Sequence, residues 1–172
     1  MDEDILSYIQ RMELLAIFSG YPLVYSIIQF ISHRRSEKTN RLTAKLPELL
    51  PLSYAFLGTL YFALFLKEIF IDQLISFSPI FFLKIWGALA FLFWFPRLRR
   101  TALYSLLHSL VFFLLIVKDL FTEMGSASGR DMIANDMRIY TLSLLANIIV
   151  LGIIVLIYII RNKTLHTNRN QV

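Results

Sequence analysis

The sequence predicts an all-α integral membrane protein, a bundle of five transmembrane helices with its N-terminus outside and its C-terminus in the cytoplasm. The first observation is composition, because 57% of the 172 residues are hydrophobic and only 17% are charged. A soluble domain of this size would expose much of that apolar surface to water. Five segments, each crossing about 30 Å of hydrocarbon with about 20 residues, would use roughly 100 positions. Little remains for a soluble domain, so residues 1–172 are predicted to form a single transmembrane domain.

The second observation is a series of apolar runs. They cover residues 14–32, 49–66, 80–95, 101–117 and 139–160. The first run follows an acidic start and ends in basic residues, whereas a cleavable signal peptide has a basic start and a small-residue cleavage site. We therefore expect a retained helix there. The third run is bracketed by Pro79 and Pro96, which suit a helix that begins and ends sharply.

The fifth run is the longest and contains no charged residue. Just before it, Ser128 and Asp131 have the spacing of a capping box. A helix that begins at this cap would run for about 30 residues, or about 45 Å, which exceeds the hydrocarbon thickness. We therefore expect the fifth helix to extend beyond the outer surface of the membrane.

The third observation is the distribution of lysine and arginine, which cytoplasmic loops carry in excess. If all five runs cross, one side receives a basic loop over residues 33–46, the turn after the third run and the C-terminal tail. Eleven basic residues then lie on that side: Arg34, Arg35, Lys38, Arg41, Lys45, Arg97, Arg99, Arg100, Arg161, Lys163 and Arg169. The opposite side receives five, namely Arg11, Lys67, Lys118, Arg130 and Arg138, among ten acidic residues. The bias alternates correctly at every loop and predicts the orientation.

Polar residues inside the runs are the candidates for function, because unpaired polar groups are costly in hydrocarbon. The candidate intramembrane or pore-lining residues are His108, Ser105, Thr101, Asn147, Ser26, Gln29 and Lys84. Spacing places Ser19, Ser26 and Gln29 on one inward face of the first helix, and it does the same for Tyr54, Gly58 and Tyr61 in the second.

His108 and Asn147 fall near the bilayer midplane. A neutral histidine bonded to an asparagine or a hydroxyl across a helix interface is favoured over a proton relay, because no acidic residue lies within the runs to act as a partner. Lys84 is predicted to extend its amine to the outer interface, where Glu68 or Asp72 can pair with it. An anion site in a pore is the alternative for Lys84.

The basic side is predicted to contact anionic lipid headgroups, each residue contributing about 1 kcal/mol. The candidate contacts are Arg34, Arg35, Lys38, Arg41, Lys45, Arg97, Arg99 and Arg100. No aromatic residue is interleaved with the charges of residues 34–45 to stack on bases, so no nucleic-acid partner is expected.

Function classes are narrowed by missing motifs. The chain has no cysteine, no metal-ligand spacing, no Gly-x-Ser-x-Gly elbow and no phosphate-binding glycine loop, so no cofactor is expected and an enzyme is the least supported class. Five crossings do not divide into two equal repeats, which disfavours a transporter. Two hypotheses remain: a non-catalytic subunit of the plasma membrane, as a homo-oligomer or with a partner membrane protein, and an oligomeric pore or permeability-altering effector.

One alternative concerns the first run, which Gly20 and Pro22 interrupt. If this run lies in the membrane interface, four helices remain and the N-terminus moves inside.

Overall fold

A computed structural model describes residues 3–34, 41–70, 79–124 and 129–169, and these are almost entirely helical. The elements are α1 (Glu3–Phe18), α2 (Tyr21–Arg34), α3 (Arg41–Phe70), α4 (Pro79–Ala88), the 3₁₀ helix η1 (Leu89–Trp94), α5 (Pro96–Arg99), α6 (Ala102–Glu123) and α7 (Gly129–Arg169). Four stretches are long and apolar enough to cross a membrane: Arg11–His33, Ala44–Phe70, Ala102–Thr122 and Ile133–Lys163. The all-helical, multi-pass membrane class is thus confirmed, whereas the apolar helix Ile80–Trp94 is shorter than the other four.

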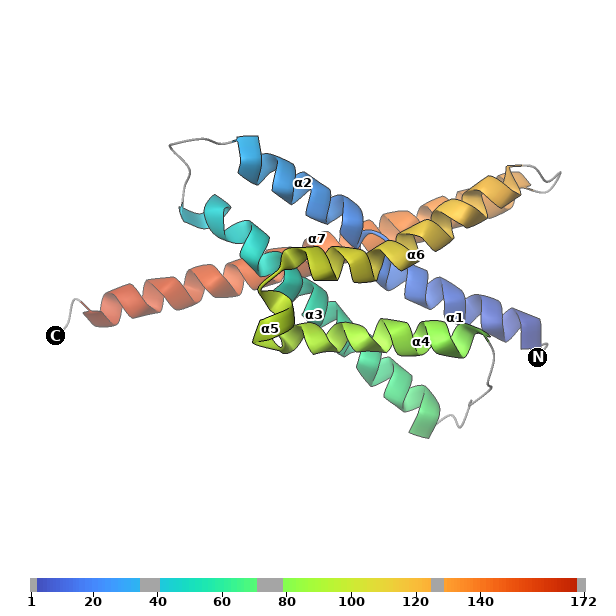
Figure 1. Ribbon diagram of the computed structural model, residues 1–172, viewed down its shortest axis with the longest axis horizontal. Helices are drawn as coiled ribbons and strands as arrows, with labels where there is room; N and C mark the ends of the chain where they lie inside the picture. Colours follow the sequence, from blue (N-terminus) through green and yellow to red (C-terminus); the bar gives the residue numbers. More distant parts are fainter. Residues whose placement is uncertain (1–2, 35–40, 71–78, 125–128, 170–172) are drawn as a thin grey trace.

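The helices alternate in direction along the long axis of the molecule (Figure 1). α1 and α2 continue one another, α3 returns, α4 and η1 run forward again, α6 returns, and α7 runs the whole length beside them (Figure 1). The first residue of α1 and the last of α7 therefore lie at opposite ends. This placement suits an odd number of passes.

The first apolar run is broken but packed into the core. α1 ends at Phe18 and α2 begins at Tyr21, with Pro22 in its first turn, where a missing N–H costs least. A Cβ added to Gly20 would overlap the backbone of Leu144 in α7, so only glycine permits this crossing. Leu14 and Phe18 are fully buried. The first run is therefore long and well packed, and the third run is the one whose length is marginal.

The third run gains length by changing its helical period. α4 has 10 residues and η1 has 6. At 1.5 Å per α-helical residue and 2.0 Å per 3₁₀ residue, they span about 27 Å together. η1 lies directly against α3, because a Cβ on Gly58 would come within 2.5 Å of the carbonyl carbon of Ala90. The absence of a side chain at Gly58 thus lets the backbone of η1 pack directly against α3.

One expectation about the loops needs correction. The predicted basic loop 33–46 is helical at both ends, because α2 continues to Arg34 and α3 begins at Arg41. Pro47 and Pro51 consequently lie inside α3. Membrane helices tolerate such prolines because neighbouring groups satisfy the freed backbone carbonyls.

α7 is longer than its apolar run, as expected. The predicted cap Ser128 lies outside the described residues, and the helix begins at Gly129. It has 41 residues, about 61 Å at 1.5 Å per residue. The helix also continues to Arg169 at the C-terminal end, an extension that apolar patterning does not predict because those residues are polar.

Candidate functional site

His108 of α6 is the centre of a polar and aromatic cluster in the bundle. Its Nε2 lies 2.9 Å from the carbonyl oxygen of Trp86, and its Nδ1 lies 2.7 Å from the hydroxyl of Tyr54. A carbonyl can only accept, so Nε2 carries the hydrogen, and in the neutral ring Nδ1 accepts from Tyr54. The expectation of a histidine bonded to a hydroxyl across a helix interface is met by Tyr54, not by Asn147.

Trp86 and His108 contact each other in three ways. Their rings stack with centroids 4.7 Å apart and planes 8° from parallel. The Trp86 indole N–H also donates to the His108 carbonyl oxygen at 3.2 Å. The third contact is the imidazole Nε2–H bond to the Trp86 carbonyl oxygen, three residues before the helical period changes to 3₁₀ at Leu89. His108 therefore links α6 to α4 by two hydrogen bonds and a ring stack.

A second contact lies between α2 and α6. The Tyr21 hydroxyl is 2.7 Å from Ser105 Oγ, and Ser105 Oγ donates to the Ala102 carbonyl oxygen at 2.7 Å. Because the serine hydrogen is committed to Ala102, Tyr21 is the donor to Ser105. The rings of Tyr21 and Tyr54 lie 4.4 Å apart, which joins this contact to the His108 cluster.

Two polar side chains of α7 bond to the break between α1 and α2. Ser143 Oγ accepts from the N–H of Gly20 at 2.9 Å, and Asn147 Nδ2 donates to the Ile17 carbonyl oxygen at 2.9 Å. Hydrocarbon offers no water to backbone groups that a helix break leaves free, so neighbouring side chains must bond to them. Both residues are buried, and they satisfy the N–H of Gly20 and the carbonyl oxygen of Ile17 at the break.

Ion pairs join the helices at one end of the bundle. Lys84 Nζ lies 2.6 Å from Glu68 Oε2, one of its two expected partners, and Lys84 is only 5% exposed. Its amine is thus held between α3 and α4. Arg11 donates to both carboxylate oxygens of Asp119 at 2.6 Å, which ties α1 to α6.

The other candidates in the runs lie apart from this network. Thr101 is exposed and directly precedes α6. Ser26 is exposed on α2 and donates to the carbonyl oxygen of Pro22, while Gln29 is half-buried. The expected inward face of the first helix is therefore wrong at Ser26, because the break at Gly20 interrupts a single helical period. The inward face of the second helix is confirmed, since Tyr54, Gly58 and Tyr61 are all buried.

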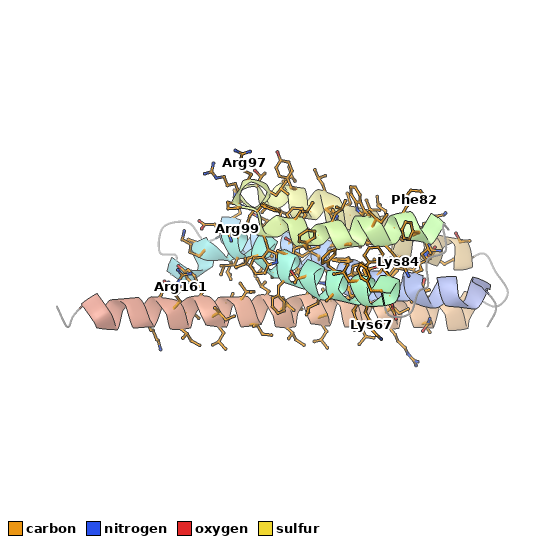
Figure 2. The ribbon with its side chains drawn as sticks, turned by 90° about the horizontal axis from the view of Figure 1, so that it is seen from below. Lys67, Phe82, Lys84, Arg97, Arg99 and Arg161 are labelled. Carbon is orange, nitrogen blue, oxygen red and sulfur yellow. The ribbon has the colours of Figure 1, made fainter. Side chains whose placement is uncertain are left out.

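Basic residues lie toward both ends of the bundle. Arg97, Arg99 and Arg161 lie at one end of the bundle, and Lys67 and Lys84 lie toward the other (Figure 2). Three arginines of the turn around α5 are exposed: Arg97, Arg99 and Arg100. Lys45 is paired with Glu48 at 2.8 Å. The side chains of Arg34, Arg35, Lys38 and Arg41 lie outside the described residues.

Sequence reasoning missed Tyr21 and Trp86, and it placed Tyr54 inward without assigning it a hydrogen-bond partner. Tyr21, Tyr54 and Trp86 each combine a buried ring or ring face with a hydrogen bond. The available signal was the presence of residues with a polar tip in the middle of apolar runs, because such tips need a partner when they are buried.

The arrangement supplies hydrogen bonds and ion pairs between helices. In the part of the chain that the structure describes, no group of three His, Cys, Asp or Glu side chains could hold a metal ion. No known protein family, curated protein or solved structure matches this chain.

Proposed function

We propose that this chain is a non-catalytic, multi-pass membrane subunit that acts by assembly, either with copies of itself or with a partner membrane protein. The observation that supports this proposal is the use of the interior polar groups. His108, Ser105, Asn147 and Lys84 all bond to other helices or the backbone of the same chain. We place the function on the surface of the bundle, where large apolar side chains are exposed on α2, α3, α4, α6 and α7.

We further propose that the chain crosses the membrane five times, with the N-terminus outside. Three features support this topology. The ends of α1 and α7 lie at opposite ends of the molecule (Figure 1), and the third run reaches about 27 Å against about 30 Å of hydrocarbon. The exposed residues Arg97, Arg99 and Arg161 lie at one end of the bundle (Figure 2). With four crossings, both termini would lie on the same side.

The basic end is proposed to face the cytoplasm and to contact anionic headgroups of the plasma membrane. Arg97, Arg99 and Arg100 are exposed there. Glu48, in α3, is already paired with Lys45. Charge complementarity therefore favours an anionic lipid surface.

The pore hypothesis has less support. His108 and Ser105 are buried within one chain, so a path between protomers would use Ser26 and Gln29 of α2. Reconstitution in liposomes tests this hypothesis. The subunit proposal predicts no ion flux from a verified oligomer, whereas flux that changes on Gln29→Leu would support the pore instead.

The experiment that tests the subunit proposal is purification of the full chain from its own membrane in mild detergent or nanodiscs, followed by mass determination. We expect a defined oligomer or a stable complex with a second membrane protein. A chain that is strictly monomeric and without partners across several lipid-to-protein ratios contradicts the proposal.

A further inference from the structure

We infer that anionic lipid headgroups reach inward to the arginines of α5, so that the bilayer is thinner beside α4, η1 and α6 than beside α7. The partner is a phospholipid whose phosphate lies deeper in the membrane than those of the surrounding lipids. This inference rests on the proposed five crossings. It adds a depth to the proposed headgroup contact, which charge alone does not give.

α6 has a short apolar length on its lipid-facing side. Exposed charges bound it, because Arg100 lies just before the helix and Lys118 near its outer end. Between them, residues 102–117 contain no Asp, Glu, Lys or Arg and span about 24 Å at 1.5 Å per residue. The candidate span Ala102–Thr122 is longer only because it includes Lys118 and Asp119. Lys118 continues the exposed stripe of α6, which follows helical spacing: Leu103, Leu107, Val111, Leu114, Lys118 and Phe121.

α7 is bounded in the same way but is longer. Arg138 and Arg161 are both exposed, and no charged residue lies between them. Residues 139–160 span about 33 Å, about 9 Å more than the corresponding part of α6. Tilting shortens the thickness that a helix crosses, so it can fit α7 to about 30 Å of hydrocarbon, but it cannot lengthen α6. One flat bilayer therefore does not match both helices.

The third run is as short as α6 and lies beside it. Trp86 of α4 stacks on His108 of α6, which places the two helices side by side. The ion pair of Lys84 with Glu68 lies toward the outer end of this run. Only about 18 Å of uncharged helix, residues 85–94, separates this pair from the turn at α5. α4, η1 and α6 thus form one continuous face with a short apolar length.

The missing length lies at the end of the bundle that carries α5. Figure 2 shows Arg161 of α7 farther toward this end than Arg97 and Arg99 of the α5 turn. Trp94 and Phe95, directly before α5, are 44% and 57% exposed. Aromatic side chains are enriched at the level of the headgroups. They therefore place the membrane surface at α5, inside the level at which α7 leaves the hydrocarbon.

An anionic phospholipid is the partner that fits the α5 turn. Arg97, Arg99 and Arg100 are exposed there, and guanidinium groups bind phosphate with paired hydrogen bonds. A bilayer that stayed at full thickness would surround these charges with hydrocarbon, which is costly, and local thinning relieves that cost. The alternative is that the arginine side chains extend outward to an unthinned surface. Leu103, one turn into α6, would then lie in hydrocarbon, so its depth separates the two cases.

The test compares depths at matched positions. The chain has no cysteine, so a nitroxide can be attached to a single introduced thiol before reconstitution in nanodiscs of anionic phospholipid with eighteen-carbon chains. Leu103 and Ile153 are both exposed, and each lies 15 residues, about 22 Å, from the outer basic residue of its helix, Lys118 or Arg138. Collision with a neutral, water-soluble nickel chelate should be at least fivefold more frequent for Leu103→Cys than for Ile153→Cys. Equal accessibility overturns the inference.

Matched controls lie one turn deeper. Leu107 and Ile149 are exposed, and each lies 11 residues from the same outer basic residues. Leu107→Cys and Ile149→Cys should both be shielded from the chelate. High accessibility of Leu107→Cys would place water along α6 and overturn the inference as well.

A second comparison tests the arginines themselves. Replacing Arg97, Arg99 and Arg100 together by glutamine should lower the chelate accessibility of Leu103→Cys at least threefold, whereas Arg161→Gln should leave it unchanged. An unchanged value after the triple substitution overturns the inference. Equal accessibility of Leu103→Cys and Ile153→Cys in a chain that forms a defined oligomer or complex overturns the thinning alone. A monomer without partners that shows the accessibility difference contradicts only the proposed subunit function.

Discussion

The hydrogen bond between Tyr54 and His108 offers the sharpest test of the interior network. His108→Leu removes the acceptor of the fully buried Tyr54 hydroxyl and the donor to the Trp86 carbonyl. A buried group left unpaired costs about 1–3 kcal/mol, so the variant should lose about 3 kcal/mol of unfolding free energy. Tyr54→Phe leaves only the Nδ1 acceptor unpaired and should lose about 1 kcal/mol.

The two substitutions should not be additive. Hydrogen bonds between membrane helices couple by about 0.6 kcal/mol on average and about 1.7 kcal/mol at most. The double variant Tyr54→Phe/His108→Leu should therefore be about 1 kcal/mol more stable than the sum of the single losses predicts. Reversible unfolding in mixed micelles, titrated with a denaturing detergent and followed by tryptophan fluorescence, measures all four free energies.

A matched control uses a residue whose stability effect should be independent of His108. Thr122→Ala removes an exposed hydroxyl of α6 that lies 14 residues, or about 21 Å, along the helix from His108. Combined with His108→Leu, it should be additive within about 0.5 kcal/mol. If Tyr54 and His108 are equally additive, the hydrogen bond does not stabilise the bundle, and the reasoning is refuted.

Three further perturbations follow from the packing, all measured by the same unfolding titration. Gly58→Ala drives a Cβ into the η1 backbone and should lower the free energy of unfolding by about 1–3 kcal/mol. Gly152→Ala in monomeric chains should cause no loss, because its Cβ position is open. Equal effects of the two substitutions would contradict the close contact of α3 with η1. Asn147→Leu leaves the carbonyl at the α1/α2 break unpaired and should cost about 1–3 kcal/mol, and a neutral result would mean that the break needs no repair. Lys84→Met should lower the free energy of unfolding by about 3 kcal/mol or less, since the unpaired Glu68 keeps some exposure to solvent. Adding Glu68→Gln should restore most of that loss. No recovery would show that the broken ion pair does not cause the loss of stability.

How far the sequence predicts this structure depends on whether a helical period is continuous. The apolar runs locate all the long helices, and uninterrupted spacing places Tyr54, Gly58 and Tyr61 inward. The same argument fails at Ser26, because the break at Gly20 disrupts a single helical period. The pairing of Lys84 with Glu68 is predictable, since both fall at the same end of neighbouring runs.

The network around His108 depends on tertiary structure that no local pattern contains. Trp86 and His108 come from two different runs and stack only in the folded bundle. Propensities also do not predict the change of α4 to a 3₁₀ helix at Leu89, within an apolar run. Similarly, the hydrogen bonds of Ser143 and Asn147 to the α1/α2 break depend on where that break meets α7, which no local pattern contains.

The central claim is that the third run crosses the membrane and makes the total five. Because the chain lacks cysteine, thiols can be placed singly on either side of that run, with Ser76→Cys before it and Arg99→Cys after it. In intact cells, a membrane-impermeant maleimide should label Ser76→Cys, and it should label Arg99→Cys only after the membrane is permeabilised. Labelling of both cysteines from the same side would show that Pro79–Trp94 does not cross, and it would contradict the five-helix topology.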